Sequence, residues 1–300
     1  MSAATAQPMQ GQKLFGRLEP LSVAMLTCVG SVCFIILAHL AVILWLSVIE
    51  GSPGAAVHSY SWKNYQEVFT DGRTVDVLIN TIGFSVVSLL VALVFGLPAA
   101  WLVERTDLRG KTLLYTLMTI GMLIPGFAAA MGWLFLMHPR IGLLNVWAKQ
   151  LFGLDNSPFD IASVMGMGWV QGLNLAPLAF IMTAAVFRAM DPALEEAAQS
   201  LGAAPERALW RITLPLIAPN LLAGGLLAFA FSMLEVSDSM ILSQQSAHFP
   251  ITKAIYSLIM SLGNGPQLAS ALGVWAMIFL TVTIVAASVL LGRKLGALFR

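Results

Sequence analysis

Five polar side chains lie inside otherwise apolar stretches, where they suit binding and passage of a solute rather than bond breaking. Gln171 and Asn174 belong to one stretch, and Glu235, Ser237 and Asp238 lie towards the end of the next. Polar groups at membrane depth are costly unless they face protein or water. We therefore expect these residues to line a translocation path or its outer gate. The alternative is hydrogen bonding between helices, the usual role of Gln and Asn between spans.

Two of these residues are acids. Glu235 and Asp238 are three residues apart, a spacing that places both carboxylates on one face of a helix. Such a pair suits a cationic solute such as iron or a polyamine. The alternative is that the acids anchor Arg140 or Lys253.

The sequence gives no pattern for catalysis, a metal centre or a cofactor. The histidines are dispersed, and no His-Glu-x-x-His occurs. Gly110-Lys111-Thr112 resembles the end of a phosphate-binding loop, but Arg105 stands where the first glycine is required. We expect a tight turn there. His39, within a span, is expected to form a packing hydrogen bond, with a proton relay as the alternative.

Composition places the chain in a bilayer. Its 300 residues are 58% hydrophobic and 10% charged, with a mean hydropathy of +0.83. The net charge of +1 offers no field that attracts nucleic acid. Cys28 and Cys33 share one apolar stretch and point in different directions on a helix, so no disulfide is expected.

Six apolar stretches are each long enough to cross about 30 Å of hydrocarbon as a helix. They cover residues 21–49, 77–103, 112–137, 161–187, 217–242 and 268–291. The first is expected to be a retained span rather than a cleaved signal peptide. With the N-terminus inside, eleven of the 16 Lys and Arg residues fall in inner segments, so the positive-inside rule selects N-in and C-in. We expect an inner segment at 1–20, one membrane domain at 21–292 and an inner tail at 293–300.

The inner loop 190–215, between the fourth and fifth stretches, predicts two short helices. Asp191 suits an N-cap followed by Pro192 at the first helical position. Gly202 is placed to end the first helix in a left-handed turn, and Pro205 can open the second. Alanines beside a glycine turn predict a low, rigid knob for a partner groove. An ordinary amphipathic linker on the membrane surface would explain the helices but not the spacing described next.

The loop resembles the signature of binding-protein-dependent ABC importer permeases: Glu-Ala-Ala, three residues, Gly, nine residues, then Ile-x-Leu-Pro. Glu196-Ala197-Ala198, Gly202 and Ile212-Thr213-Leu214-Pro215 stand at those spacings. The resemblance implies an all-α membrane protein with the type I importer permease fold, six spans and a cytoplasmic coupling helix. It also implies that one set of residues couples the chain to an ATPase: Glu195, Glu196, Ala197, Ala198, Leu201, Gly202, Ile212, Leu214 and Pro215.

Further matches extend the resemblance over most of the chain. Asn80-Thr81, Glu104-Arg105-Thr106-Asp107 and Ile124-Pro125 look similar to the ferric-iron, polyamine, phosphonate and thiamine permease subgroup. The resemblance implies a bacterial inner-membrane importer subunit for such a solute. ATP would be hydrolysed by a separate ABC ATPase dimer, not by this chain. The implied partners also include a second permease subunit, identical or related, an external solute-binding protein and membrane lipid.

Two other classes remain as alternatives. An ion-coupled secondary transporter would use its own intramembrane acids and histidine, but it gives no reason for the inner-loop signature. An intramembrane enzyme lacks paired catalytic residues. Dependence of uptake on ATP hydrolysis or on an ion gradient separates the first alternative from the importer.

Overall fold

The computed structural model describes residues 20–51, 54 and 59–298, and this part of the chain is mostly helical. Five helices are long and apolar enough to cross a membrane. Four are single helices, and the fifth candidate, Pro205–Leu242, is interrupted as described below. The long helices are α1 (Pro20–Val48), α3 (Arg73–Arg105), α7 (Val164–Ala189), α10 (Leu214–Met233) and α13 (Gly265–Leu298). The last helix runs past residue 292, where the membrane domain was expected to end.

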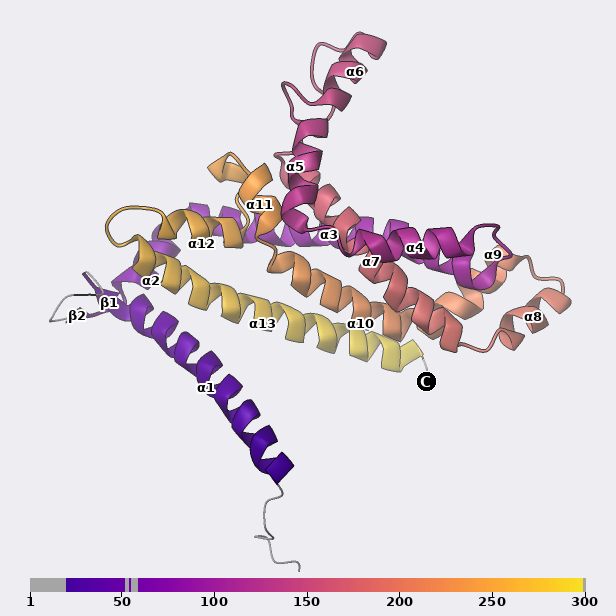
Figure 1. Cartoon of the computed structure of the whole chain (residues 1–300), viewed down its shortest axis with the longest axis horizontal. Coiled ribbons are helices and arrows are strands. Elements are labelled where there is room, and N and C mark those ends of the chain that lie inside the picture. Colours follow the sequence, from indigo (N-terminus) through magenta and orange to yellow (C-terminus); the bar gives the residue numbers. More distant parts are fainter. Residues whose placement is uncertain (1–19, 52–53, 55–58, 299–300) are drawn as a thin grey trace, which may run out of the picture.

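The third apolar stretch is not one straight helix. It folds as α4 (Lys111–Gly121) and α5 (Gly126–Met137), which meet at 101°. Pro125 precedes α5 in an extended conformation, and its ring removes a backbone donor that a continuous helix through this stretch would need. If this bent pair is one span, the candidate spans number six. Figure 1 shows α4 lying along the bundle, while α5 and then α6 (Leu143–Phe152) project from it.

The core is the contact between α3 and α7, which pack together more extensively than any other pair of described elements. Small residues allow this close approach. A β-carbon on Gly172 would lie 2.7 Å from the Ser88 carbonyl oxygen, and one on Gly96 would lie 2.7 Å from the Ala179 β-carbon. Phe84 of α3 and Phe180 of α7 are fully buried beside this seam.

The fifth apolar stretch is broken as well. α10 ends at Met233, and the short α11 (Ser237–Leu242) follows after Leu234, Glu235 and Val236. α11 packs against α5 and α7. Two broken spans therefore meet α7 on the same side of the bundle.

Short elements close the end of the bundle opposite α8 (Figure 1). They are β1 (Ile49–Glu50), β2 (Ser59–Tyr60), α2 (Lys63–Thr70), the 3-10 turn η2 (Ser246–His248) and α12 (Ile251–Ile259). β1 and β2 pair antiparallel, with Ile49 opposite Tyr60. Asn64 holds α2 to the end of α1, because its amide donates to the carbonyls of Ser47 and Ile49, both at 3.0 Å.

α1 is peripheral. It meets α13 and α2 near β1 and diverges from the bundle along its length (Figure 1). None of its most apolar window is buried. Cys28 and Cys33 are both exposed and unbonded, as expected. His39 places its Nδ1 2.7 Å from the Ile35 carbonyl oxygen of its own helix.

Candidate functional site: the α8 loop and the polar breaks

The loop between α7 and α10 folds as the sequence predicts at its first helix and its turn. α8 spans Ala193–Ser200, and the Asp191 carboxylate accepts a hydrogen bond of 2.9 Å from the Ala193 amide. Pro192 lies just before the helix rather than at its first position. Gly202 has a φ of +88°, the left-handed conformation that glycine adopts without steric cost. Pro205 then opens α9 (Pro205–Ala208).

The second part of the loop differs from a simple α-helix. After α9 the chain forms a π-helix, η1 (Leu209–Thr213), which leads directly into α10. π-helical turns of this kind are rare and occur often at functional sites. Ile212 and Leu214 are partly buried at this junction, and Pro215 is exposed.

The predicted coupling residues fall into two groups by exposure. Glu196, Ala197, Leu201 and Gly202 are exposed, with Leu201 at 90%, and Ala198 is partly covered. These residues form an accessible face on α8. Glu195 differs, because only 13% of its side chain is exposed.

Glu195 turns into its own chain. Its Oε1 accepts a hydrogen bond of 2.7 Å from the Thr213 hydroxyl and lies 3.5 Å from Arg105 Nε. The longer contact is an ion pair rather than a hydrogen bond. The sequence did not predict that Glu195 would contact Arg105 or Thr213, because no spacing rule connects residues so far apart in the chain.

The polar residues of the predicted path lie where the broken spans meet α7. Gln171 is buried on α7, and Asn174 lies almost one turn further along the same helix. Asp238 is fully buried on α11. The expectation that Glu235 and Asp238 share one helical face is wrong, because Glu235 lies in the break before α11. Its Oε1 instead accepts from the Ser237 amide at 2.6 Å and the Asp238 amide at 3.3 Å.

Asp238 is an acidic residue whose side chain is fully buried. Asn174 and Glu235 are both close enough to influence its carboxyl group. Neither carboxylate oxygen, nor the Asn174 amide nitrogen, has a hydrogen-bond partner of good geometry within the described residues. Among these residues no ion pair joins either acid to Arg140 or Lys253. Lys253 donates instead to the Met240 carbonyl at 3.1 Å.

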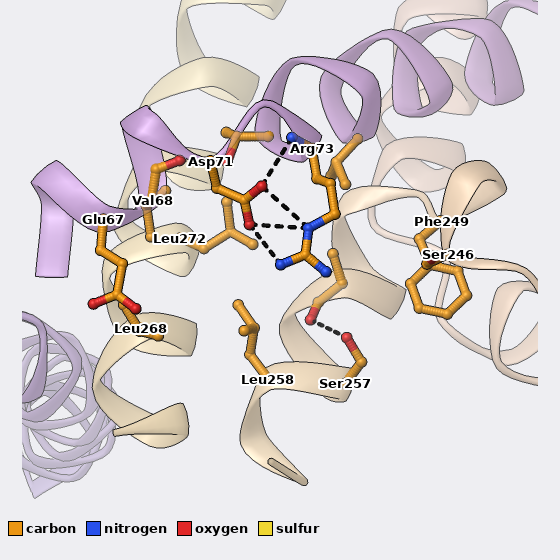
Figure 2. A pocket seen from close by; sticks show the side chains of 13 residues that line it. Glu67, Val68, Asp71, Arg73, Ser246, Phe249, Ser257, Leu258, Leu268 and Leu272 are labelled. Carbon is orange, nitrogen blue, oxygen red and sulfur yellow. Dashed lines mark hydrogen bonds and ion pairs between the residues drawn. The ribbon is translucent and has the colours of Figure 1, made fainter. Parts of the chain in front are cut away.

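A separate cavity of about 170 Å³ lies towards the end of the bundle opposite α8, between α2, α3, α12 and α13. Figure 2 shows its apolar lining, which includes Val68, Leu258 and Leu272, and the Asp71–Arg73 pair at its edge. It contains none of the predicted site residues.

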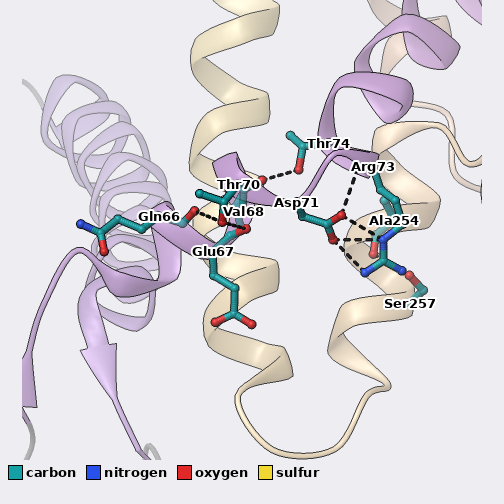
Figure 3. Close-up of polar contacts among 9 residues, drawn as sticks. All are labelled: Gln66, Glu67, Val68, Thr70, Asp71, Arg73, Thr74, Ala254 and Ser257. Carbon is teal, nitrogen blue, oxygen red and sulfur yellow. Dashed lines mark hydrogen bonds and ion pairs between the residues drawn. The ribbon is translucent and has the colours of Figure 1, made fainter.

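The Asp71–Arg73 pair is well aligned. Arg73 Nη2 lies 2.7 Å from Asp71 Oδ2, and the Arg73 amide donates to Oδ1 at 3.0 Å (Figure 3). The hydrogen bonds from Arg73 hold the pKa of the Asp71 carboxyl below its usual value of 3.8. Beside the pair, the hydroxyls of Thr70 and Thr74 donate to the carbonyls of Gln66 and Val68 and close the end of α2.

Within the described residues, no group of three or more His, Cys, Asp or Glu side chains is arranged to hold a metal ion. The turn at Gly110 has a φ of +94° and begins α4, as expected for a tight turn.

Comparison with known proteins gives the family. Residues 92–295 match the family described as "Binding-protein-dependent transport system inner membrane component". The chain is 27% identical over 197 residues to the trehalose transport system permease SugB of Mycobacterium tuberculosis, covering 63% of this chain and 65% of the relative. It is 30% identical over 199 residues to the molybdenum transport system permease ModB of Haemophilus influenzae, covering 63% and 81%. The chain spans about two thirds, 65%, of the length of SugB.

Solved structures share the fold. The crystal structure of a bacterial ABC transporter involved in the import of the acidic polysaccharide alginate has a TM-score of 0.72 at 21% identity, covering 91% of this chain and 95% of that chain. The relatives and structures named here are sugar, molybdenum and alginate systems, which do not support the expected ferric-iron, polyamine, phosphonate or thiamine subgroup. The broader expectation is confirmed: this multi-pass protein of the inner membrane belongs to the family of binding-protein-dependent transport system inner membrane components.

Proposed function

We propose that the chain is the transmembrane permease subunit of an ATP-driven, solute-binding-protein-dependent importer. The observation that carries this proposal is α8, a short helix with an exposed alanine face, closed by the left-handed Gly202 and inserted between two spans. Such a knob fits a groove on a motor subunit. The distribution of Lys and Arg supports placing α8 and both termini on the cytoplasmic side.

The chain would act as one subunit of a larger assembly, because the exposed face of α8 suits the docking of another subunit. ATP would be hydrolysed by a cytoplasmic ABC ATPase dimer docked on Glu196, Ala197, Ala198, Leu201 and Gly202. A second permease subunit, identical or related, would complete the membrane domain, and an external binding protein would deliver the solute. The family description supports the binding protein as a partner.

The solute would pass beside Gln171, Asn174, Glu235, Ser237 and Asp238. Non-helical backbone at membrane depth is tolerated only where it is enclosed by protein or lines a water-filled cavity. Two such breaks meet at this position, where the Asn174 amide nitrogen and both Asp238 carboxylate oxygens have no hydrogen-bond partner among the described residues. Their free hydrogen-bonding capacity is available to a passing polar group.

The solute is proposed to be a neutral, hydroxyl-rich molecule of the saccharide class. The two acids would repel an oxyanion such as molybdate, whereas sugar hydroxyls donate to carboxylates and to amide oxygens. SugB is named for trehalose, which supports this class over the metal and polyamine solutes that the subgroup resemblance implied. A polyamine or ferric iron would also be attracted by acids, but the relatives named above are not of that kind.

Two measurements test the function. Thermal shifts of the purified external binding protein with trehalose, maltose, molybdate, spermidine and ferric citrate identify the solute class, because a ligand that binds the folded state raises its Tm. Stabilisation by molybdate alone would contradict the saccharide proposal. Uptake into proteoliposomes that contain the whole complex should then require ATP hydrolysis. Uptake that follows an ion gradient without the ATPase would favour a secondary transporter instead.

A further inference from the structure

We propose that Glu195 is a positioning residue that ties the coupling helix α8 to the ends of α3, α7 and α10, so that a push on α8 moves these helices together. The inference rests on the proposed function, because it assumes that an ATPase docks on α8. It assigns a role to three residues, Glu195, Arg105 and Thr213, that the docking face alone does not explain.

The tie is built from side chains of three different elements. The Glu195 carboxylate is on α8, Arg105 is the last residue of α3, and Thr213 ends η1 where α10 begins. Oε1 of Glu195 receives both contacts, at 3.5 Å from Arg105 Nε and 2.7 Å from Thr213 Oγ1. One carboxylate oxygen therefore bridges α3 and the start of α10.

Arg105 adds the fourth element. Its Nη2 donates to the carbonyl oxygens of Phe187 and Met190, both at 2.9 Å, at the end of α7. A cation at the C-terminus of a helix is favoured by the unpaired carbonyls and the negative end of the helix dipole. These contacts do not involve Glu195, so we expect Arg105 to remain on α7 when Glu195 is replaced.

The contacts of Glu195 with Arg105 and Thr213 are buried, and burial strengthens them. The exposed side-chain fractions of Arg105 and Glu195 are 9% and 13%, and Thr213 is fully buried. Charges withdrawn from water interact more strongly than surface pairs, and separating them strands each one in a poorly solvated site. Movement of α8 away from α3 is therefore resisted.

The backbone alone does not provide this link. α8 packs against its sequence neighbours α9 and η1, whereas its link to α3 is the ion pair between Glu195 and Arg105. The opposite face of α8, with Glu196 and Ala197, is exposed. One face is free for a partner and the other is tied to the spans.

The chain also supplies a matched control. Glu104 and Arg188 form a second ion pair between α3 and α7, at 2.5 Å, beside the tie. This pair does not include α8, and the Arg188 side chain is 64% exposed. Breaking it perturbs the same two helices without touching Glu195.

The test measures whether α8 and α3 move as one body in the intact complex with its ATPase. Cys28 and Cys33 are replaced by Ser, and spin labels are attached at Gln199→Cys on α8 and Leu108→Cys after α3, both exposed positions outside the docking face. Each assembly contains one labelled copy, isolated through a tag on that copy. Electron paramagnetic resonance then gives the distance between the labels before and after trapping with ATP and vanadate.

We expect one narrow distance distribution that trapping leaves unchanged in the otherwise native chain. Glu195→Gln combined with Thr213→Val should broaden the distribution and make it shift on trapping. Glu104→Gln should behave as the native chain does. Thr213→Ser, which keeps the hydroxyl, should preserve the narrow distribution, and this separates a lost bond from a misfolded loop.

Two results would overturn the inference. One is a Glu195→Gln/Thr213→Val distribution that stays narrow and unshifted although the ATPase is bound and trapped. The other is equal broadening by Glu104→Gln. Failure of the native chain to bind any ATPase is a different result, because it removes the proposed function itself and the tie with it.

Discussion

Ser237 packs against Gly126: a β-carbon added to Gly126 would lie 3.7 Å from the Ser237 β-carbon. Gly126 is the first residue of α5, and Ser237 is the first residue of α11. Two helix starts, each following an interruption in a span, therefore touch. Both leave backbone groups that no preceding helical turn satisfies, so this contact brings unpaired backbone groups together inside the bundle.

Asp238→Asn is expected to raise the stability of the protein and lower its transport activity. The substitution removes a fully buried carboxylate that has no hydrogen-bond partner among the described residues. A neutral amide costs less to bury without partners than an ionised carboxylate, and the gain is expected to be about 1–3 kcal/mol. Thermal unfolding in detergent and ATP-dependent uptake in proteoliposomes measure the two effects. The exposed Asp155→Asn serves as the control, and an Asp238→Asn protein that unfolds more easily would contradict the interpretation.

Bulk on the exposed face of α8 should prevent ATPase binding. Ala197→Trp is expected to weaken the affinity for the ATPase at least tenfold, about 1.4 kcal/mol, without disturbing the helix. Gln150→Trp on α6 adds the same bulk far from α8 and should leave the affinity unchanged. Titration of the solubilised permease with purified ATPase gives both values, and equal affinities would exclude this face as the docking site.

Gly202→Trp combines bulk with backbone strain, because Gly202 has a positive φ. Gly202→Ala separates the two effects. Its methyl group meets no atom within 4 Å, so its cost of about 1–2 kcal/mol comes from the left-handed conformation alone. If Gly202→Ala abolishes ATPase binding as completely as Gly202→Trp, the shape of the turn matters more than its low profile.

The seam between α3 and α7 should tolerate no added methyl group. Gly172→Ala places a β-carbon 2.7 Å from the Ser88 carbonyl oxygen and is expected to cost about 1–3 kcal/mol through overpacking. Gly132→Ala in α5 meets no atom within 4 Å and should instead stabilise the protein by about 0.5–1 kcal/mol. Comparison of the two midpoints of thermal unfolding checks the difference in sign.

The Asp71–Arg73 pair predicts a small acid-dependent effect. Because the folded-state pKa of Asp71 is lowered, its contribution to stability is present above the ordinary pKa of 3.8 and is lost as the pH falls through the folded value. Asp71→Asn should therefore lower the Tm slightly near neutral pH, and the difference from the native protein should shrink below pH 3.8. A difference that grows on acidification would contradict the sign.

The sequence predicted the local features of the α8 loop because they depend on neighbouring residues. Asp191 provides the cap, Gly202 the left-handed turn and Pro205 the second start, and each acts through the backbone within a few positions. The breaks in the third and fifth apolar stretches were missed, since hydropathy measures composition and not helix continuity. Pro125 stands at the first of these breaks, but proline alone does not identify a break, because Pro98 and Pro177 lie inside continuous helices.

The partners of individual side chains were less predictable. Glu195 was expected to belong to the set that couples the chain to an ATPase, and its contacts with Thr213 and Arg105 were not foreseen. Glu235 and Asp238 were expected on one helical face, but the chain leaves the helix between them. In both cases the deciding contact joins distant parts of the chain, and helical periodicity carries no information about such contacts.

α1 remains apart from these networks, and its surroundings follow from its exposure. None of its most apolar window is covered by the rest of this chain, so its side chains are free to meet acyl tails or a second subunit. The two native thiols, Cys28 and Cys33, point outward from this helix. They offer the unaltered chain ready attachment points for depth-sensitive fluorophores, which would report membrane thickness around the transporter instead of its internal rearrangements.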